Sequence, residues 1–366
     1  MLLSERSALI KRMRRSIIKT EKITLKKYIM NVLNGLAIGT VVALIPGALL
    51  GELFKALLPI FPQGVFILNA TSMSNSMLGL VVGVFVGMNF KFTPIQSTSI
   101  GLAAILGGGA VQFTAEGMFL SGTGDVINVG ITAAIAAGLI LLLGNKLKAY
   151  TILLVSPIAL IIGGGFGFAI LPYVRSITIF IGILVAQLLN LQPIIMAVLI
   201  AMVFSVLIVS PITTVGIALA ISLMGIGSGA ANLGVVAAGF GLAIAGWKVN
   251  PIGTSLAHFI GSPKISMANV FAKPRIMIPI ICNAALLGVL ASIFNIQGTP
   301  MSAGFGFSGL VGPVNHLNIS GFSFLNILLT ILIFLIAPIV FGIGFNYLFT
   351  KVWPIISPED YKLEIS

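Results

Sequence analysis

Acidic residues are almost absent from the body of this chain: between Lys22 and Pro358 only Glu52, Glu116 and Asp125 occur. Charged residues make up 8% of the 366 residues and apolar residues 58%, whereas a soluble globular protein carries about 25% charged residues. So little charge cannot keep so much apolar surface in water, which excludes a soluble enzyme and a disordered polymer. The sequence therefore predicts an all-α polytopic membrane protein.

The basic residues are concentrated at the amino terminus, where nine of the twenty precede Tyr28. Within 9–19, apolar residues recur at helical spacing among basic ones, which predicts an amphipathic helix on an anionic cytoplasmic leaflet. A basic tail that only sets orientation explains the same charge, so both interpretations stay open. No cleavage pattern follows, so the segment is expected to be retained. Basic charge confined to a tail does not favour a nucleic-acid partner.

Ten apolar runs approach the length of about 20 residues that a membrane span requires. With ten crossings and a cytoplasmic amino terminus, we expect both termini of this plasma-membrane protein to be cytoplasmic. The basic residues of the loops then lie on the cytoplasmic side, as the positive-inside rule requires, and Arg175 is the one exception. We expect a basic segment at 1–28, a transmembrane domain at 29–350 and a cytoplasmic tail at 351–366. The expected runs are 29–50, 65–89, 94–113, 126–144, 150–171, 176–191, 194–226 (kinked or broken at Ser210-Pro211), 229–247, 276–296 and 322–349.

Three segments, 92–124, 249–275 and 297–321, are too rich in Gly, Pro and polar residues for simple spans. Irregular backbone persists at membrane depth only where protein or water satisfies its polar groups. These segments predict re-entrant hairpins that line a cavity.

The polar residues in and near these segments are the candidate site residues. Glu116 has no basic neighbour, and Gln112 would share its face if the segment were helical; the alternative is an external loop. Asn75 interrupts the second span, where an amide is costly in lipid. The two histidines, His258 and His316, lie in the other irregular segments and can hydrogen-bond a ligand or carry a proton. An interfacial histidine satisfied by backbone is the alternative for each.

A metal site or other cofactor is not predicted. The two histidines lack the spacing of a metal-binding motif. Cys282 is the only cysteine, so one chain forms neither a disulfide nor a cysteine metal cluster.

Several short motifs carry a family resemblance: Asn-Pro-Ile-Gly-Thr-Ser at 250–255, Met-Ala-Asn at 267–269, Lys-Pro-Arg-Ile at 273–276 and Ser-Gly-Leu-Val-Gly-Pro at 308–313. They resemble the phosphotransferase-system subunit IIC-like family that includes perfringolysin-regulator-type membrane proteins, over about residues 28–350. The resemblance implies a homodimer of about ten-helix protomers with re-entrant hairpins around a mid-membrane substrate site. In sugar-transporting relatives a Glu and a His contact the sugar or assist its phosphorylation, which Glu116 and His258 or His316 would match here.

A complete phosphotransferase transporter also uses a phosphoryl-carrying soluble module, and none is expected within these 366 residues, where Cys282 lies in an apolar run. Three alternatives stay open. Separate IIA and IIB proteins supply the phosphoryl group in trans, the protein transports the solute without phosphorylating it, or the protein only senses the solute. No self-contained catalytic site is predicted.

The leading hypothesis is a transporter that moves a small polar, carbohydrate-like solute by alternating access. The alternative is a solute-sensing membrane regulator that signals to a partner through the amino-terminal helix. An ion channel is less favoured because three sparse acids form no charged ring. The expected solute contacts are Asn75, Gln112, Glu116, Asn315 and His316, with His258 in second rank.

Overall fold

The computed structural model describes residues 23–143 and 150–363, and nearly all of its regular structure is helical. Six helices in this part are long and apolar enough to cross a membrane, and a seventh span results if the bent pair Pro62–Ser76 and Leu78–Asn89 counts as one. The chain is therefore an all-α polytopic membrane protein, as the sequence predicts. The amphipathic helix expected within 9–19 lies outside the described residues.

The first half of the chain forms one packed group. Helix α2 packs against α4, and α4 packs against α5, through glycines that let the backbones approach closely. Gly79, Gly83 and Gly87 recur every fourth residue of α4, and a Cβ on any of them would lie within 2.7 Å of α5. The elements are α2 (Leu25–Leu57), α3 (Val65–Ser76), α4 (Leu78–Asn89), α5 (Pro94–Gly108), β1 (Val111–Thr114), β2 (Gly117–Leu120), α6 (Val126–Leu143) and α7 (Thr151–Ile158).

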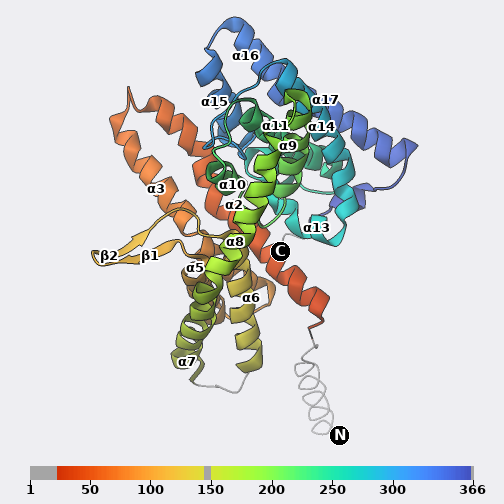
Figure 1. Cartoon of the computed structure of the whole chain (residues 1–366). Coiled ribbons are helices and arrows are strands. Elements are labelled where there is room, and N and C mark those ends of the chain that lie inside the picture. The colour runs from red at the N-terminus through yellow and green to blue at the C-terminus, as the bar shows by residue number, and fades with distance from the viewer. Residues whose placement is uncertain (1–22, 144–149, 364–366) are drawn as a thin grey trace.

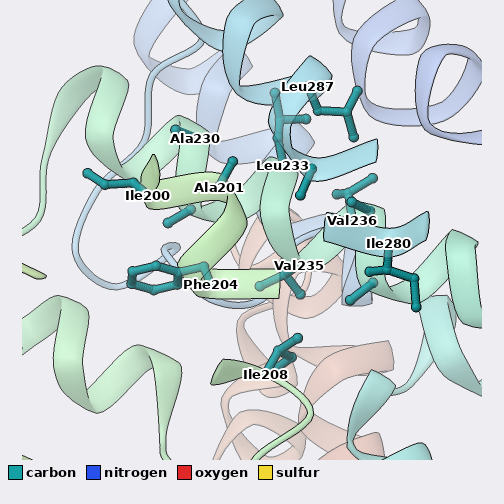
Figure 2. Close-up of a cluster of buried hydrophobic side chains, with 14 of the residues drawn as sticks. Ile200, Ala201, Phe204, Ile208, Ala230, Leu233, Val235, Val236, Ile280 and Leu287 are labelled. Carbon is teal, nitrogen blue, oxygen red and sulfur yellow. The ribbon is translucent and has the colours of Figure 1, made fainter. Parts of the chain in front are cut away.

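The second half has its own core, built mainly from α9, α11 and α14. Figure 2 shows Phe204, Leu233 and Leu287 among the side chains that fill the space between these helices. Its elements are α8 (Gly165–Leu188), α9 (Pro193–Leu207), α10 (Thr214–Ala220), α11 (Gly225–Gly246), α12 (Ile252–Ile260), α13 (Met267–Ala272), α14 (Ile278–Ile293), α15 (Val311–Ser320), α16 (Phe324–Ile331) and α17 (Ala337–Tyr347). Short turns complete it: η4 (Pro263–Ser266), η5 (Pro274–Met277), η6 (Ser308–Leu310), the π turns η7 (Leu332–Ile336) and η8 (Leu348–Val352), and η9 (Pro358–Tyr361).

The two halves are joined by α2, by α8 and by the segment around η4. In Figure 1, α5, α6 and α7 lie at one end of the molecule, α9, α11, α14 and α17 lie toward the other, and α8 runs between them. Met267 of α13 packs into the core of the first half, although α13 follows α11 and α12 in the chain. The segment 252–275 therefore lies between the two cores.

The expected spans 150–171 and 176–191 are wrong as separate elements. One continuous helix runs over Leu153–Leu188, through a π turn, η3 (Ala159–Gly164), and past Pro172. A membrane helix tolerates proline because local π adjustment and neighbouring groups satisfy the freed backbone. Arg175 therefore lies within a helix and not in an external loop.

The expected re-entrant hairpin at 92–124 is also wrong. Helix α5 ends at Gly108 because Gly109 adopts the left-handed conformation (φ 73°) that caps helices. The next residues form a two-stranded antiparallel ribbon that projects from the side of the molecule in Figure 1. The break expected near Ser210-Pro211 is confirmed, because α9 ends at Leu207 and α10 begins at Thr214.

Candidate functional site

The middle of α2 is where the two halves meet. Pro46 lies inside this helix, and because proline has no N–H it removes one helical hydrogen bond. The hydroxyl of Ser74 in α3 donates to the carbonyl of Ala43 at 2.8 Å. A helix weakened by proline is thus held from the side by a polar group.

Three other segments of the chain contact the turn of α2 that contains Pro46. Gly47 faces the amide of Asn75, with 3.2 Å from a constructed Cβ to either amide atom. A Cβ on Gly261, just after α12, would lie 3.2 Å from Ile45. Gly309 in η6 lies against the carbonyl of Ala48. We call this meeting point the junction: residues 45–48 with Asn75, the segment 252–266 and residues 308–310.

The segment 252–266 brings a buried histidine to the junction. His258, which is 1% exposed, has Nδ1 3.2 Å from the carbonyl oxygen of Ser255 and Nε2 2.8 Å from the hydroxyl of Ser266. A carbonyl only accepts, so this pairing satisfies a neutral ring with its proton on Nδ1, and the Ser266 hydroxyl donates to Nε2. Both ring nitrogens are therefore occupied by protein groups.

Lys264 is the buried lysine of the junction, at 4% exposure. Its Nζ donates to the carbonyls of Ser210 at 2.5 Å and Ile212 at 2.8 Å, both in the break between α9 and α10. Within the part of the chain that the structure describes, Lys264 forms no ion pair, so no acid neutralises it. An ammonium has three donors, and two contacts leave one for an added acceptor.

Two buried oxygens in the segments that form the junction lack hydrogen-bond partners: Oδ1 of Asn75 and Oγ of Ser255. Buried polar atoms are normally paired, so each unpaired one requires an explanation. Four other residues also have a buried side-chain oxygen without a hydrogen-bond partner: Thr40, Ser97, Asn128 and Asn283. These four lie on helices inside one half or the other, whereas Asn75 and Ser255 belong to the junction.

The loop between α14 and α15 is braced by polar side chains. The backbone N–H of Gln297 donates to Nδ1 of His316 at 3.1 Å, and that of Thr299 donates to Oδ1 of Asn315 at 3.0 Å. His316 therefore carries its proton on Nε2, the opposite tautomer to His258. Asn315 and His316 hold backbone in place, and their expected contact with a solute stays a prediction.

Further bonds attach this loop to α10 and α11. The hydroxyl of Thr214 donates to the carbonyl of Gly304 at 3.1 Å, and the backbone N–H of Gly306 donates to Oδ1 of Asn232 at 3.1 Å. Gly225 and Gly298 pair as an isolated β-bridge. Irregular backbone inside the second half is thus satisfied by protein groups, which is the condition for its survival at membrane depth.

Gln112 and Glu116 do not share a helical face, which corrects the sequence-based expectation. Gln112 lies in β1 opposite Phe119 of β2, and Glu116 lies in the turn between the strands. Both residues are exposed. Gly117, with φ 137°, makes this turn possible because it has no Cβ. Their contact with a solute stays a prediction.

Sequence reasoning missed Lys264, Ser255 and Ser308 as members of the junction. In the sequence, the only signal for Lys264 is its place beside Ser262-Pro263 in an irregular segment. The Ser308 hydroxyl donates to the carbonyls of Ile260 at 3.1 Å and Gly261 at 2.6 Å. In the described part of the chain, no three His, Cys, Asp or Glu side chains gather as a metal site would require.

Comparison with protein families places the chain. The family model described as "Phosphotransferase system, EIIC" matches residues 30–363. No curated protein matches the chain.

Proposed function

The chain belongs to the phosphotransferase-system EIIC family, and from this premise we propose that it carries a small polar, carbohydrate-like solute across the cell membrane by alternating access. The family supports a membrane component of sugar transport and does not favour the alternative of a solute sensor. We place the solute at the junction. A homodimer, cytoplasmic termini, the domain limits 1–28, 29–350 and 351–366, and contact of the first segment with anionic lipid are parts of the same proposal.

The observation that carries the proposal is the set of unused polar groups at the junction. Asn75 Oδ1 and Ser255 Oγ are buried and unpaired, and Lys264 in its protonated form has a third N–H beyond its two carbonyl partners. A sugar hydroxyl both donates and accepts, so it complements this mixed set. Each buried group left unpaired costs about 1–3 kcal/mol, which a bound polyol would recover.

The architecture supports alternating access because the two halves have separate cores and meet at the proline turn of α2. Transporter sites commonly lie at midplane where interrupted helices meet. We propose that the halves move relative to one another about residues 45–48. His258 and Lys264 are buried, as expected of a closed state. Any phosphoryl group would come from separate IIA and IIB proteins, with His258 or His316 near the solute.

The remaining sequence-based contacts belong to the proposal in two ways. Asn315 and His316 would act by holding the loop at 295–310 beside the solute. Gln112 and Glu116 would contribute from the exposed ribbon, outside the buried cluster.

Thermal stabilisation of the detergent-purified chain tests the proposal, because ligand that binds the native state raises its stability by mass action. The panel contains sugars, sugar phosphates, polyols and nucleosides. A selective hit should be weakened by Ser255→Ala and left intact by Ser97→Ala, since both serines lie on helices with a buried, unpaired Oγ. Equal effects of the two substitutions, or no hit for a well-folded chain, would contradict a solute site at the junction.

A further inference from the structure

A cavity lined by no residue of the junction lies at the ends of α11 and α17. It has a volume of about 700 Å³ and is closed on one side by the chain after η8. Three cations line it, Lys248, Arg275 and Lys351, together with one carboxylate, that of Asp360. Positive charge around a concave site attracts an anion.

The carboxylate of Asp360 offsets only part of this charge, because Arg275 shares it with Lys273. Its Oδ1 lies 2.8 Å from Nζ of Lys273, which does not line the cavity, and its Oδ2 lies 3.2 Å from Nη2 of Arg275. Within 23–143 and 150–363, neither Lys248 nor Lys351 forms an ion pair. Two lysines therefore face the cavity region without a counter-ion.

The two tryptophans of the chain mark the level of this cavity. Trp247 lines it at the end of α11, next to Lys248, and Trp353 follows η8, two residues after Lys351. They are 49% and 67% exposed. Tryptophan concentrates at membrane–water interfaces. Indoles beside lysines therefore place the cavity at the headgroup level of the bilayer.

An apolar strip leads from the cavity along α17. Ile343 lines the cavity and is 55% exposed, and Val340, about one turn earlier, is 58% exposed. The π turn η8, which carries Thr350 and Lys351 on the cavity wall, interrupts the regular helix at this point; π turns often occur at functional sites. The cavity thus combines cations with a hydrocarbon-facing exit.

We propose that this cavity binds the phosphodiester headgroup of an anionic phospholipid whose acyl chains lie along α17. Free phosphate presents the same anionic oxygens to the lysines. Free phosphate would leave the exposed apolar side chains of Val340 and Ile343 uncovered, whereas the acyl chains of a lipid would cover them. Lipid is therefore the favoured source of the phosphate group.

Intrinsic fluorescence tests this directly, because Trp247 lines the cavity and Trp353 directly precedes the lining residue Pro354. The full-length chain in mixed detergent micelles is titrated with brominated phosphatidylglycerol or brominated phosphatidylcholine, since bromine quenches indoles only at short range. The anionic lipid should quench more strongly at equal content. The double variant Lys248→Ala/Lys351→Ala should lose this preference, with apparent affinity reduced about fivefold for each lysine.

The matched control is Lys55→Ala/Lys91→Ala, which removes the same charge from exposed positions that do not line the cavity. It should retain the preference. Equal quenching by the two lipids, or equal loss in the two double variants, would overturn the proposal. Displacement of brominated phosphatidylglycerol by inorganic phosphate, but not by chloride at matched ionic strength, would assign the cavity to a soluble phosphate and also overturn the lipid site.

Discussion

Gly309 lies so close to Ala48 that a Cβ added to the glycine would overlap the Ala48 carbonyl oxygen. This contact joins η6 of the second half to α2 just after its proline. Gly309 also has φ 57°, a conformation that disfavours any side chain with a Cβ. Two independent constraints therefore require glycine where the halves touch.

Gly309→Ala is expected to separate η6 from α2 and to lower stability by about 1–3 kcal/mol, the usual cost of overpacking. The measurement is the melting temperature of the purified protein, with solute uptake in vesicles as a second readout. Gly344→Ala is the control because nothing lies within 4 Å of a Cβ there, so it should change neither. A neutral Gly309→Ala would show that the contact does not hold the halves together.

Lys264→Met should destabilise the protein because it leaves the carbonyls of Ser210 and Ile212 without their donor. Each orphaned buried acceptor costs about 1–3 kcal/mol. Lys55→Met, at an exposed lysine whose partner is Glu52, should shift the melting temperature little, since surface ion pairs contribute about 0–1 kcal/mol. Equal melting temperatures for the two variants would contradict a stabilising role for the contacts of Lys264 with these carbonyls.

Asp360 makes stability depend on acid pH. Burial raises the pKa of this carboxyl, but hydrogen bonds from Lys273, the backbone of Ser357 and Arg275 outweigh it and lower the pKa to about 2. A carboxyl with a lowered folded-state pKa contributes stability above its unfolded value, near 3.9, and loses that contribution as pH falls from about 4 to about 2.

Thermal melts between pH 7 and pH 2 check this expectation. The wild type should lose stability below pH 4, and Asp360→Asn should remove that part of the pH dependence while lowering stability at pH 7 by about 1 kcal/mol. Glu359→Gln, one residue away and exposed, is the control and should follow the wild-type profile. Identical acid profiles for wild type and Asp360→Asn would contradict the assignment.

Glu116→Gln and His316→Ala test the site residues that the sequence suggested, and both are expected to abolish solute binding. Their stabilities should differ. Glu116 is exposed in the ribbon turn, so its substitution should leave the melting temperature unchanged, whereas His316→Ala removes the acceptor for the Gln297 N–H and should cost about 1 kcal/mol. Ligand-induced stabilisation measures binding in each variant, and unchanged affinity in both would reject these assignments.

The membrane class and most helices could be predicted from sequence because a bilayer allows a single chain few choices. An apolar run must become a helix that satisfies its own backbone, and the runs near 29–50, 126–144 and 229–247 do so as α2, α6 and α11. The break at Ser210-Pro211 could also be predicted from the sequence, because proline interrupts an apolar run that is too long for one span. The ribbon at 111–120 was not, since the glycines that permit it also occur in packed helices.

The sequence by itself determined that this chain is a membrane protein and that polar segments interrupt its apolar spans, because those properties depend on local composition. Only the tertiary structure decided that Asn75, Gly261 and Gly309, which lie far apart in the chain, meet at one turn of α2. It also decided that Asn75 Oδ1 and Ser255 Oγ stay unpaired, whereas Asn315 and His316 bind loop backbone. Whether a buried polar group is free for a ligand depends on which distant segment packs against it, and no local pattern encodes that neighbour.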